Sequence, residues 1–255
     1  SSAASDVYKR QEYITIESTL MDGLFGSDAG AAIFGGVIVL LMILGVLLAA
    51  DRKTKEIIKE RKLVDQEIIP NIEGWYEKNH FPTDIVKKMG ETGIFGPNVS
   101  PEYGGGGLDS ISYGLIMQEL ERGDSRMRST ASVQSSLVMY PIEAYGSEEQ
   151  KKKYLPKLAS GEMLGCFGLT EPDYGSNPAG MISKLEDKGE YFLLNGAKLW
   201  ISNSPIADIA VVWAKDENKR IKGVIVERGM EGFSTPKTGG KWSLRSRLTG
   251  ELVFD

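Results

Sequence analysis

The chain has 255 residues, of which 41% are hydrophobic, so it can bury a sizeable core in one large or two small domains. Its 30 basic and 35 acidic residues give a net charge of −5 and form no basic arm in the globular part, which excludes a nucleic-acid partner. One cysteine, Cys166, and one histidine, His80, exclude a disulfide, a cysteine-based metal site and a histidine-dependent triad, and they indicate a reducing compartment.

The first 50 residues differ from the rest in composition. Residues 1–11 have no hydrophobic period, and we treat residues 1–28 as a sequencing scar followed by a polar segment. Residues 29–50 carry no charge and are long enough to cross a hydrocarbon core of about 30 Å as a single transmembrane helix. Acidic residues precede this stretch and basic residues follow it, which predicts a membrane-anchored protein with its large C-terminal part in the cytoplasm.

Three other interpretations of residues 29–50 remain open. The first is a cleavable signal peptide, for which the preceding basic region is poor and the apolar run is too long. The second is a core helix that is buried on all sides. The third is a misassembled reading frame, which the unusual first residues make less remote.

Helical signals fill residues 51–161. An amphipathic pattern over residues 51–77 predicts a helix that Pro70 can bend or divide. Ser147, followed by two glutamates, is typical of a helix start, and Gly161 closes the region. We expect further helices over residues 82–91, 110–122, 125–145 and 147–158.

From residue 162 onward the spacing of hydrophobic residues changes from that of a helix to every second residue, which indicates strands. We predict strands over residues 191–194, 197–201, 209–214, 222–227 and 251–254. Asn195-Gly196 predicts the tight turn of a hairpin between the first two, because both residues tolerate positive φ. Cys166 lies in an apolar run and fits a buried, inert thiol better than a nucleophile. The expected fold class is therefore α+β, with a helical domain over residues 51–161 and a β domain over residues 162–255.

Two segments of the β domain carry candidate binding chemistry. The first, Phe167-Gly168-Leu169-Thr170-Glu171-Pro172, runs on to Gly175-Ser176 and offers backbone N–H groups and hydroxyls in a loop. The second, Lys198-Leu199-Trp200-Ile201-Ser202-Asn203, places a tryptophan at a strand end. Without further context, such a tryptophan is more often ordinary sheet packing than the wall of a cofactor site.

Together the two segments resemble the flavin-binding middle domain of the acyl-CoA dehydrogenases. The resemblance covers residues 51–255 and implies FAD as cofactor, bound by a β-barrel-like middle domain that follows an N-terminal helical domain. It further implies that the loop and the strand end lie on either side of the flavin ring. The FAD-binding residues implied in this way are Phe167, Leu169, Thr170, Gly175, Ser176, Trp200, Ile201 and Ser202.

A run from Glu119 to Ser125, then Arg128-Ser129 and residues 132–139, is similar to the glutaryl-CoA dehydrogenase branch of the family. The resemblance implies that Arg128 meets the distal carboxylate of the substrate, as a fork-shaped cation suits a buried carboxylate. It implies Glu121, Ser129 and Ser176 as further substrate-binding residues. The expected reaction is α,β-dehydrogenation of glutaryl-CoA with decarboxylation to crotonyl-CoA, with an electron-transfer flavoprotein or similar acceptor as partner and a homo-oligomer as the complete form.

The family continues beyond the position of Asp255 into a C-terminal helical bundle that carries the catalytic glutamate. We therefore assign no catalytic residue, and we expect that these 255 residues alone do not turn over substrate. Departures from the family pattern are Tyr174, Asn177 and Arg247, the last of which stands where the family has serine. Two alternatives stay open: a non-catalytic, membrane-anchored module that binds acyl-CoA or flavin, and a dehydrogenase for uncharged acyl chains. If the membrane span is artefactual, the mitochondrial matrix is the expected compartment.

Overall fold

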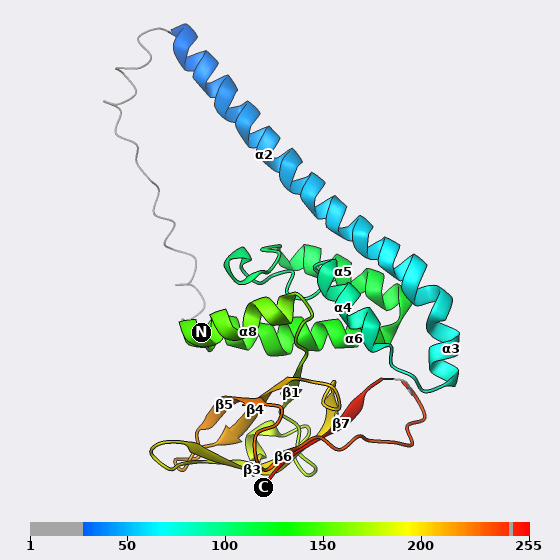
Figure 1. The fold of residues 1–255 in the computed structure, drawn as a ribbon. Helices are drawn as coiled ribbons and strands as arrows, with labels where there is room; N and C mark the ends of the chain where they lie inside the picture. Colours follow the sequence, from blue (N-terminus) through cyan, green and yellow to red (C-terminus); the bar gives the residue numbers. More distant parts are fainter. Residues whose placement is uncertain (1–27, 245–246) are drawn as a thin grey trace, which may run out of the picture. The chain divides into compact units, whose positions relative to one another are not determined.

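The computed structural model describes residues 28–244 and 247–255 of the chain (Figure 1). The chain divides into two compact units, Ser1–Arg52 and Lys53–Asp255, and each is described by itself. In the second unit a set of helices precedes a β-sheet. This order confirms the predicted α+β class for that unit.

The helix α2 (Asp28–Leu63) contains the whole apolar stretch 29–50 and continues into a segment rich in lysine, arginine and glutamate. Within the described residues, no helix combines the length and the apolar character that crossing a membrane requires. The transmembrane helix predicted at residues 29–50 and the membrane-anchored localisation are therefore wrong. The prediction treated 22 uncharged residues as a separate element, whereas they begin a helix of 36 residues whose second part is charged.

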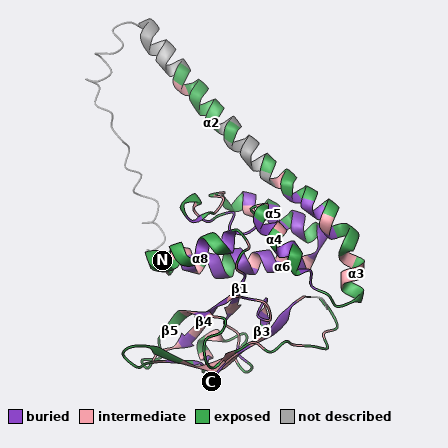
Figure 2. Ribbon diagram, viewed as in Figure 1, coloured by how far each residue is buried: buried purple, intermediate pink, exposed green. Residues whose placement is uncertain are grey.

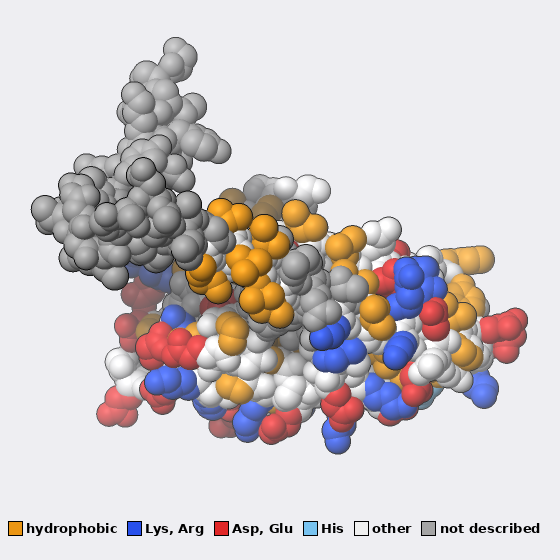
Figure 3. Space-filling model, turned by 90° about the horizontal axis from the view of Figure 1, so that it is seen from above, with side chains coloured by type: hydrophobic (Ala, Val, Ile, Leu, Met, Phe, Trp, Pro, Cys, Tyr) orange, Lys and Arg blue, Asp and Glu red, His pale blue; other side chains and the backbone are white. Residues whose placement is uncertain are grey.

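The alternative of a core helix buried on all sides is also not supported for the described part of α2. Apolar side chains of this helix are exposed (Figure 3), namely Val37, Val39, Leu40, Leu41, Met42, Ile43, Leu44 and Leu48. A helix inside a core would hide them from solvent.

The helical part of the second unit is built from short elements that follow α2. They are η1 (Val64–Ile68), η2 (Ile69–Asn71), α3 (Ile72–Glu77), α4 (Thr83–Glu91), η3 (Pro101–Tyr103), α5 (Ser110–Gly123), α6 (Ser125–Ser132), η4 (Val133–Met139), α7 (Tyr140–Tyr145) and α8 (Glu148–Ala159). Ser147 caps α8 in a reciprocal bond with Gln150, which confirms the predicted helix start. The inner faces of these helices are buried (Figure 2), with Leu120, Met127 and Leu155 among the side chains hidden from solvent.

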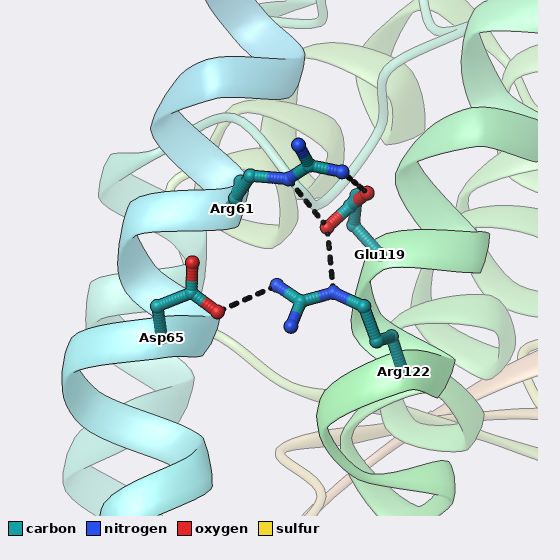
Figure 4. A network of polar contacts seen from close by, with 4 residues as sticks. All are labelled: Arg61, Asp65, Glu119 and Arg122. Carbon is teal, nitrogen blue, oxygen red and sulfur yellow. Dashed lines mark hydrogen bonds and ion pairs between the residues drawn. The ribbon is translucent and has the colours of Figure 1, made fainter.

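A network of four charged side chains joins the end of α2 and the following element η1 to α5 (Figure 4). The Arg61 Nη2 lies 2.7 Å from Glu119 Oε1, and Arg122 Nε lies 3.0 Å from Glu119 Oε2. Arg122 also reaches Asp65 at 2.7 Å. Hydrogen bonds from Arg61 and Arg122 hold the pKa of Glu119 below its usual value, although burial opposes the shift. The network therefore fixes the last turns of α2 against α5, between residues 58 positions apart in the sequence.

The strands form one seven-stranded sheet in the order β1-β4-β2-β3-β7-β6, with β5 paired to the other edge of β4. Their bounds are β1 (Gly165–Gly168), β2 (Lys184–Asp187), β3 (Phe192–Ser202), β4 (Ile209–Lys215), β5 (Ile221–Glu227), β6 (Phe233–Ser234) and β7 (Thr249–Phe254). Within the described residues β5 and β6 do not pair with each other, so the sheet is an open half-barrel. Cys166 lies in its core, where burial raises the thiol pKa to about 12, as expected for an inert cysteine.

The hairpin predicted at Asn195-Gly196 is wrong, because β3 runs through both residues without a turn. The strand pairs with β2 up to Asn195 and with β7 from Gly196 onward, so the dipeptide marks a change of partner. Gly196 has a φ of 143°, and a Cβ on it would lie 2.4 Å from the Oγ of Ser183. The glycine is needed for the close approach of this backbone to Ser183, and not for a turn.

Candidate functional site

The loop that follows β1 lies against the end of β3. Because β1 pairs with β4 and stops at Gly168, the chain leaves the sheet at Leu169. The backbone N–H of Leu199 donates to the carbonyl oxygen of Thr170 at 2.9 Å, which joins the loop to β3. The structure thus brings together the two segments that sequence analysis selected.

An irregularity near the end of β3 turns Trp200 out of the sheet. The pairing with β7 shifts between Lys198 and Ile201, and Trp200 between them has a φ of 62°. This left-handed conformation is uncommon for a bulky residue and marks a constrained site. Trp200 is 58% exposed, whereas Ile201 is buried in the core of the β domain. Ile201, predicted as a binding residue, can therefore contact a ligand through its backbone but not through its side chain.

Beneath the loop, a buried ion pair joins the two segments, and sequence analysis did not select either partner. Lys198 Nζ lies 2.8 Å from Glu171 Oε1, and the side chains are 0% and 2% exposed. The same carboxylate accepts from the N–H of Ile182 at 2.6 Å and from that of Ser183 at 3.0 Å. A lysine in an apolar strand and a glutamate within an apolar loop were the local signals for such a pair.

The pKa of Glu171 reflects the partners of this buried carboxyl. Burial alone would raise the pKa of this carboxyl, but the N–H of Ile182 and the ammonium of Lys198 bring it below its usual value. A charged carboxylate in the interior needs such partners, since unpaired charges are costly there. The ion pair therefore fixes the loop at Glu171 and leaves the neighbouring Thr170 in a defined place.

The polar groups of the loop are available to a ligand. Within the described part of the chain, the hydroxyls of Thr170 and Ser176 form no hydrogen bond. Gly175 has open space around its Cα, because a Cβ built there meets no atom within 4 Å. Ser202, at the end of β3, accepts a hydrogen bond from Arg247. Phe167 and Leu169 are half-buried at the base of the loop, and Phe167 packs edge-on against Trp213.

The predicted substrate-binding residues lie on the neighbouring helices α5 and α6. Arg128 Nε lies 2.6 Å from Glu121 Oε2, and both side chains are partly exposed. The hydrogen bond from Arg128, together with one from Ser125, lowers the pKa of Glu121. Ser129, the next residue on α6, is buried. The structure therefore brings Glu121 and Arg128 into direct contact, as an ion pair.

Asn203 connects α6 to the sheet, and it is another residue that sequence analysis missed. Its Oδ1 accepts from Thr130 at 3.3 Å, and its Nδ2 donates to the carbonyl of Gly165 at 3.3 Å. Its backbone N–H donates to Leu248. Asn203 has a φ of 69°, a conformation that asparagine tolerates better than most residues. It holds the helix of Arg128 beside the strand end that carries Ser202.

A cavity of about 940 Å³ lies elsewhere in the second unit, between α7 and strands β2, β4 and β5. Tyr145, Phe192 and Trp213 contribute aromatic side chains to its wall. None of the predicted site residues lines it. The candidate site is therefore the open surface around Trp200 and the loop, and this cavity is not part of it.

Comparison with known proteins identifies the two parts of the second unit. Residues 55–162 match the acyl-CoA dehydrogenase N-terminal domain, and residues 166–255 match the acyl-CoA dehydrogenase middle domain. A glutaryl-CoA dehydrogenase of Desulfococcus multivorans is 39% identical over 203 residues, which cover 76% of this chain and 52% of that protein. The chain thus spans about half the length of this relative.

Solved structures agree with these matches. A glutaryl-CoA dehydrogenase from Mycobacterium smegmatis in complex with FADH2 is 45% identical with a TM-score of 0.77, over 80% of this chain and 52% of that one. A glutaryl-coenzyme A dehydrogenase in complex with glutaryl-CoA is 38% identical with a TM-score of 0.76, over 80% of this chain and 53% of that one. With family matches over most of its length, the chain belongs to the acyl-CoA dehydrogenase family.

Proposed function

We propose that this chain binds FAD at the surface formed by the loop after β1 and the end of β3. The observation that carries the proposal is the convergence of Thr170 and Trp200, held by the backbone bond from Leu199 and by the Glu171–Lys198 pair. A planar, exposed indole beside free hydroxyl donors suits an aromatic ring with polar edges. The FADH2 complex of the Mycobacterium smegmatis relative supports the choice of cofactor.

The residues present fit this cofactor. The hydroxyls of Thr170 and Ser176 have no partner among the described residues, and Ser202 keeps its own hydroxyl hydrogen, because it serves only as acceptor toward Arg247. Phe167, Leu169, Gly175 and Ile201 would complete the site with apolar surface and backbone groups. When bound, FAD supplies the hydride-accepting chemistry that no side chain can provide. Thr170 and Ser202 would direct hydrogen bonds at the ring, and Trp200 would cover it and exclude water.

We further propose that the complete protein is an oxidoreductase that acts on glutaryl-CoA and forms crotonyl-CoA. Arg128 would bind the distal carboxylate, with Glu121 setting its orientation and Ser129 and Ser176 lying along the acyl and thioester portions. The sequence of this chain is 39% and 45% identical to those of two glutaryl-CoA dehydrogenases, which supports this substrate. An electron-transfer flavoprotein or similar acceptor would receive the electrons, and the complete protein would be a homo-oligomer.

Replacing Trp200 with leucine is expected to weaken FAD binding about fivefold, because the aromatic contact is worth roughly 1 kcal/mol beyond its buried area. FAD titration of the purified chain, followed by the absorbance of the bound flavin, measures the dissociation constant. Trp242→Leu is the matched control, since Trp242 is 96% exposed and is not among the predicted FAD-binding residues. Equal affinities for the wild-type chain and the Trp200 variant, or an equal loss in both variants, would contradict the proposed site.

The substrate proposal predicts that Arg128→Gln weakens glutaryl-CoA binding about 100-fold and leaves butyryl-CoA binding nearly unchanged. The reason is that only glutaryl-CoA carries a carboxylate that can pair with the guanidinium, a charge-assisted bond worth up to about 3 kcal/mol. Calorimetric titration of the FAD-loaded chain with both thioesters measures the difference. Arg220→Gln is the control, because this exposed arginine pairs with Asp216 in a distant loop. If both thioesters lost affinity equally, an uncharged acyl chain would be the better substrate.

A further inference from the structure

Arg247 lies just before β7 and reaches the end of β3. Its Nη2 donates a hydrogen bond to the Oγ of Ser202. The pairing of Ser202 with Thr249 places the two segments side by side. A guanidinium can only donate, so the Ser202 oxygen serves Arg247 while its own hydrogen remains for another acceptor. This contact therefore holds Ser202 in the role of a donor.

The positive charge of Arg247 is not neutralised by a neighbour. Within residues 28–244 and 247–255 no carboxylate pairs with it, and its buried Nε has no hydrogen-bond partner. Burial lowers the pKa of Arg247, and the positive charge of Arg128 lowers it further. Arg128 itself is paired with Glu121 at 2.6 Å. The guanidinium of Arg247 is thus a partly buried cation without a counter-charge, and it contacts the hydroxyl of Ser202. At this place it favours negative charge on a ligand.

We propose that Arg247 is a positioning residue that makes Ser202 a stronger donor and increases the preference of the site for the reduced flavin. This inference rests on the proposed binding of FAD beside Ser202. A hydride taken from the substrate brings two electrons and one proton to the neutral oxidised ring, and so leaves one negative charge there. A hydroxyl donor that is itself polarised by a cation stabilises such a charge more than a neutral pair does.

The position of Arg247 makes the inference specific to this chain. The resemblance to the family implies serine at this position, which is short and uncharged. Exchange of Arg247 for serine therefore introduces the residue that the resemblance implies, and it removes the guanidinium together with most of its aliphatic stem. The expected result is that Arg247→Ser binds oxidised FAD as tightly as the wild-type chain does but prefers reduced FAD about tenfold less. A tenfold change for a two-electron couple is about 30 mV, so the midpoint potential should become more negative by that amount.

The experiment measures the midpoint potential of the FAD-loaded chain by slow enzymatic reduction in the presence of a redox dye. Arg247→Lys should keep most of the potential because it keeps the charge. Arg220→Ser, which removes an arginine paired with Asp216 in the β4–β5 loop, should leave the potential unchanged. Far-ultraviolet circular dichroism and the affinity for oxidised FAD show whether each variant is folded. If Arg247→Ser does not fold, the shift between the wild-type chain and Arg247→Gln decides the question.

A second pair of variants tests whether Arg247 acts through Ser202. In the background of Ser202→Ala, the shift caused by Arg247→Ser should fall to less than half, because the two changes remove one shared interaction. Full additivity would overturn the role assigned to Ser202, and an unchanged potential in Arg247→Ser would overturn the role of Arg247. A wild-type chain that fails to bind FAD would overturn the proposed function, and this inference with it. The two failures are distinguished by the FAD titration alone.

Discussion

Replacing Lys198 with methionine is expected to lower the free energy of unfolding by about 3–5 kcal/mol, the loss found when one partner of a buried ion pair is removed. Lys198 and Glu171 are 2.8 Å apart, and neither side chain is more than 2% exposed. Without the ammonium, the carboxylate keeps only the N–H groups of Ile182 and Ser183 as partners in the interior. The loop after β1 should then lose one of its two attachments to β3 and keep only the backbone bond between Leu199 and Thr170.

Urea unfolding followed by circular dichroism measures this loss. Lys188→Met is the matched control, because Lys188 pairs with Glu186 at 2.8 Å with both side chains about 40% exposed. Such a surface pair contributes at most about 1 kcal/mol. The double variant Lys198→Met/Glu171→Gln should be less destabilised than the sum of the single changes, since no buried charge is left alone. A cost below about 1 kcal/mol for Lys198→Met would show that the pair does not stabilise the loop.

The ion pair also shows which parts of the site local sequence can predict. Thr170, Trp200 and Ser202 lie in two short segments whose residue types and order mark them as candidates. The role of Lys198 depends on a contact with Glu171, 27 residues earlier, and that contact exists only because the loop folds back on β3. Asn203 is similar, since its side chain and backbone N–H have partners in α6, in β1 and in the segment before β7. A charged residue in an apolar segment signals locally that it is paired, but the local sequence does not identify a partner that lies far away in the chain.

The fold was predictable wherever the hydrophobic period was clear, as in the helices before residue 161 and in β4 and β5. It was not predictable where the meaning of a pattern depends on its surroundings. The uncharged residues 29–50 fit a membrane span in isolation, but they begin a helix that continues into charged residues. In the same way, Asn195-Gly196 has the composition of a tight turn, yet it lies inside β3 because the strand changes partners there.

Gly196→Ala is therefore expected to destabilise the β domain by about 2–4 kcal/mol, from overpacking and from a backbone conformation that only glycine adopts readily. The added methyl would lie 2.4 Å from the Oγ and 2.9 Å from the Cα of Ser183, and Gly196 has a φ of 143°. Urea unfolding measures the cost. Gly189→Ala is a useful comparison, because Gly189 also has positive φ, at 85°, but has open space around it. It should show the conformational cost without the collision.

Asn195→Ala separates the observed strand from the predicted hairpin. In a tight turn of the predicted type, Asn195 would have positive φ, and alanine there would cost about 1 kcal/mol or more. In the structure Asn195 is not among the residues with positive φ and pairs with Lys184 in β2. Its replacement should therefore change stability by less than about 0.5 kcal/mol.

In the background of Ser183→Gly, the cost of Gly196→Ala should fall, because two of the three colliding atoms belong to the removed side chain. Coupling between positions 183 and 196 would require that β3 pass beside Ser183, whereas a hairpin turn at Asn195-Gly196 gives no reason for these two residues to interact.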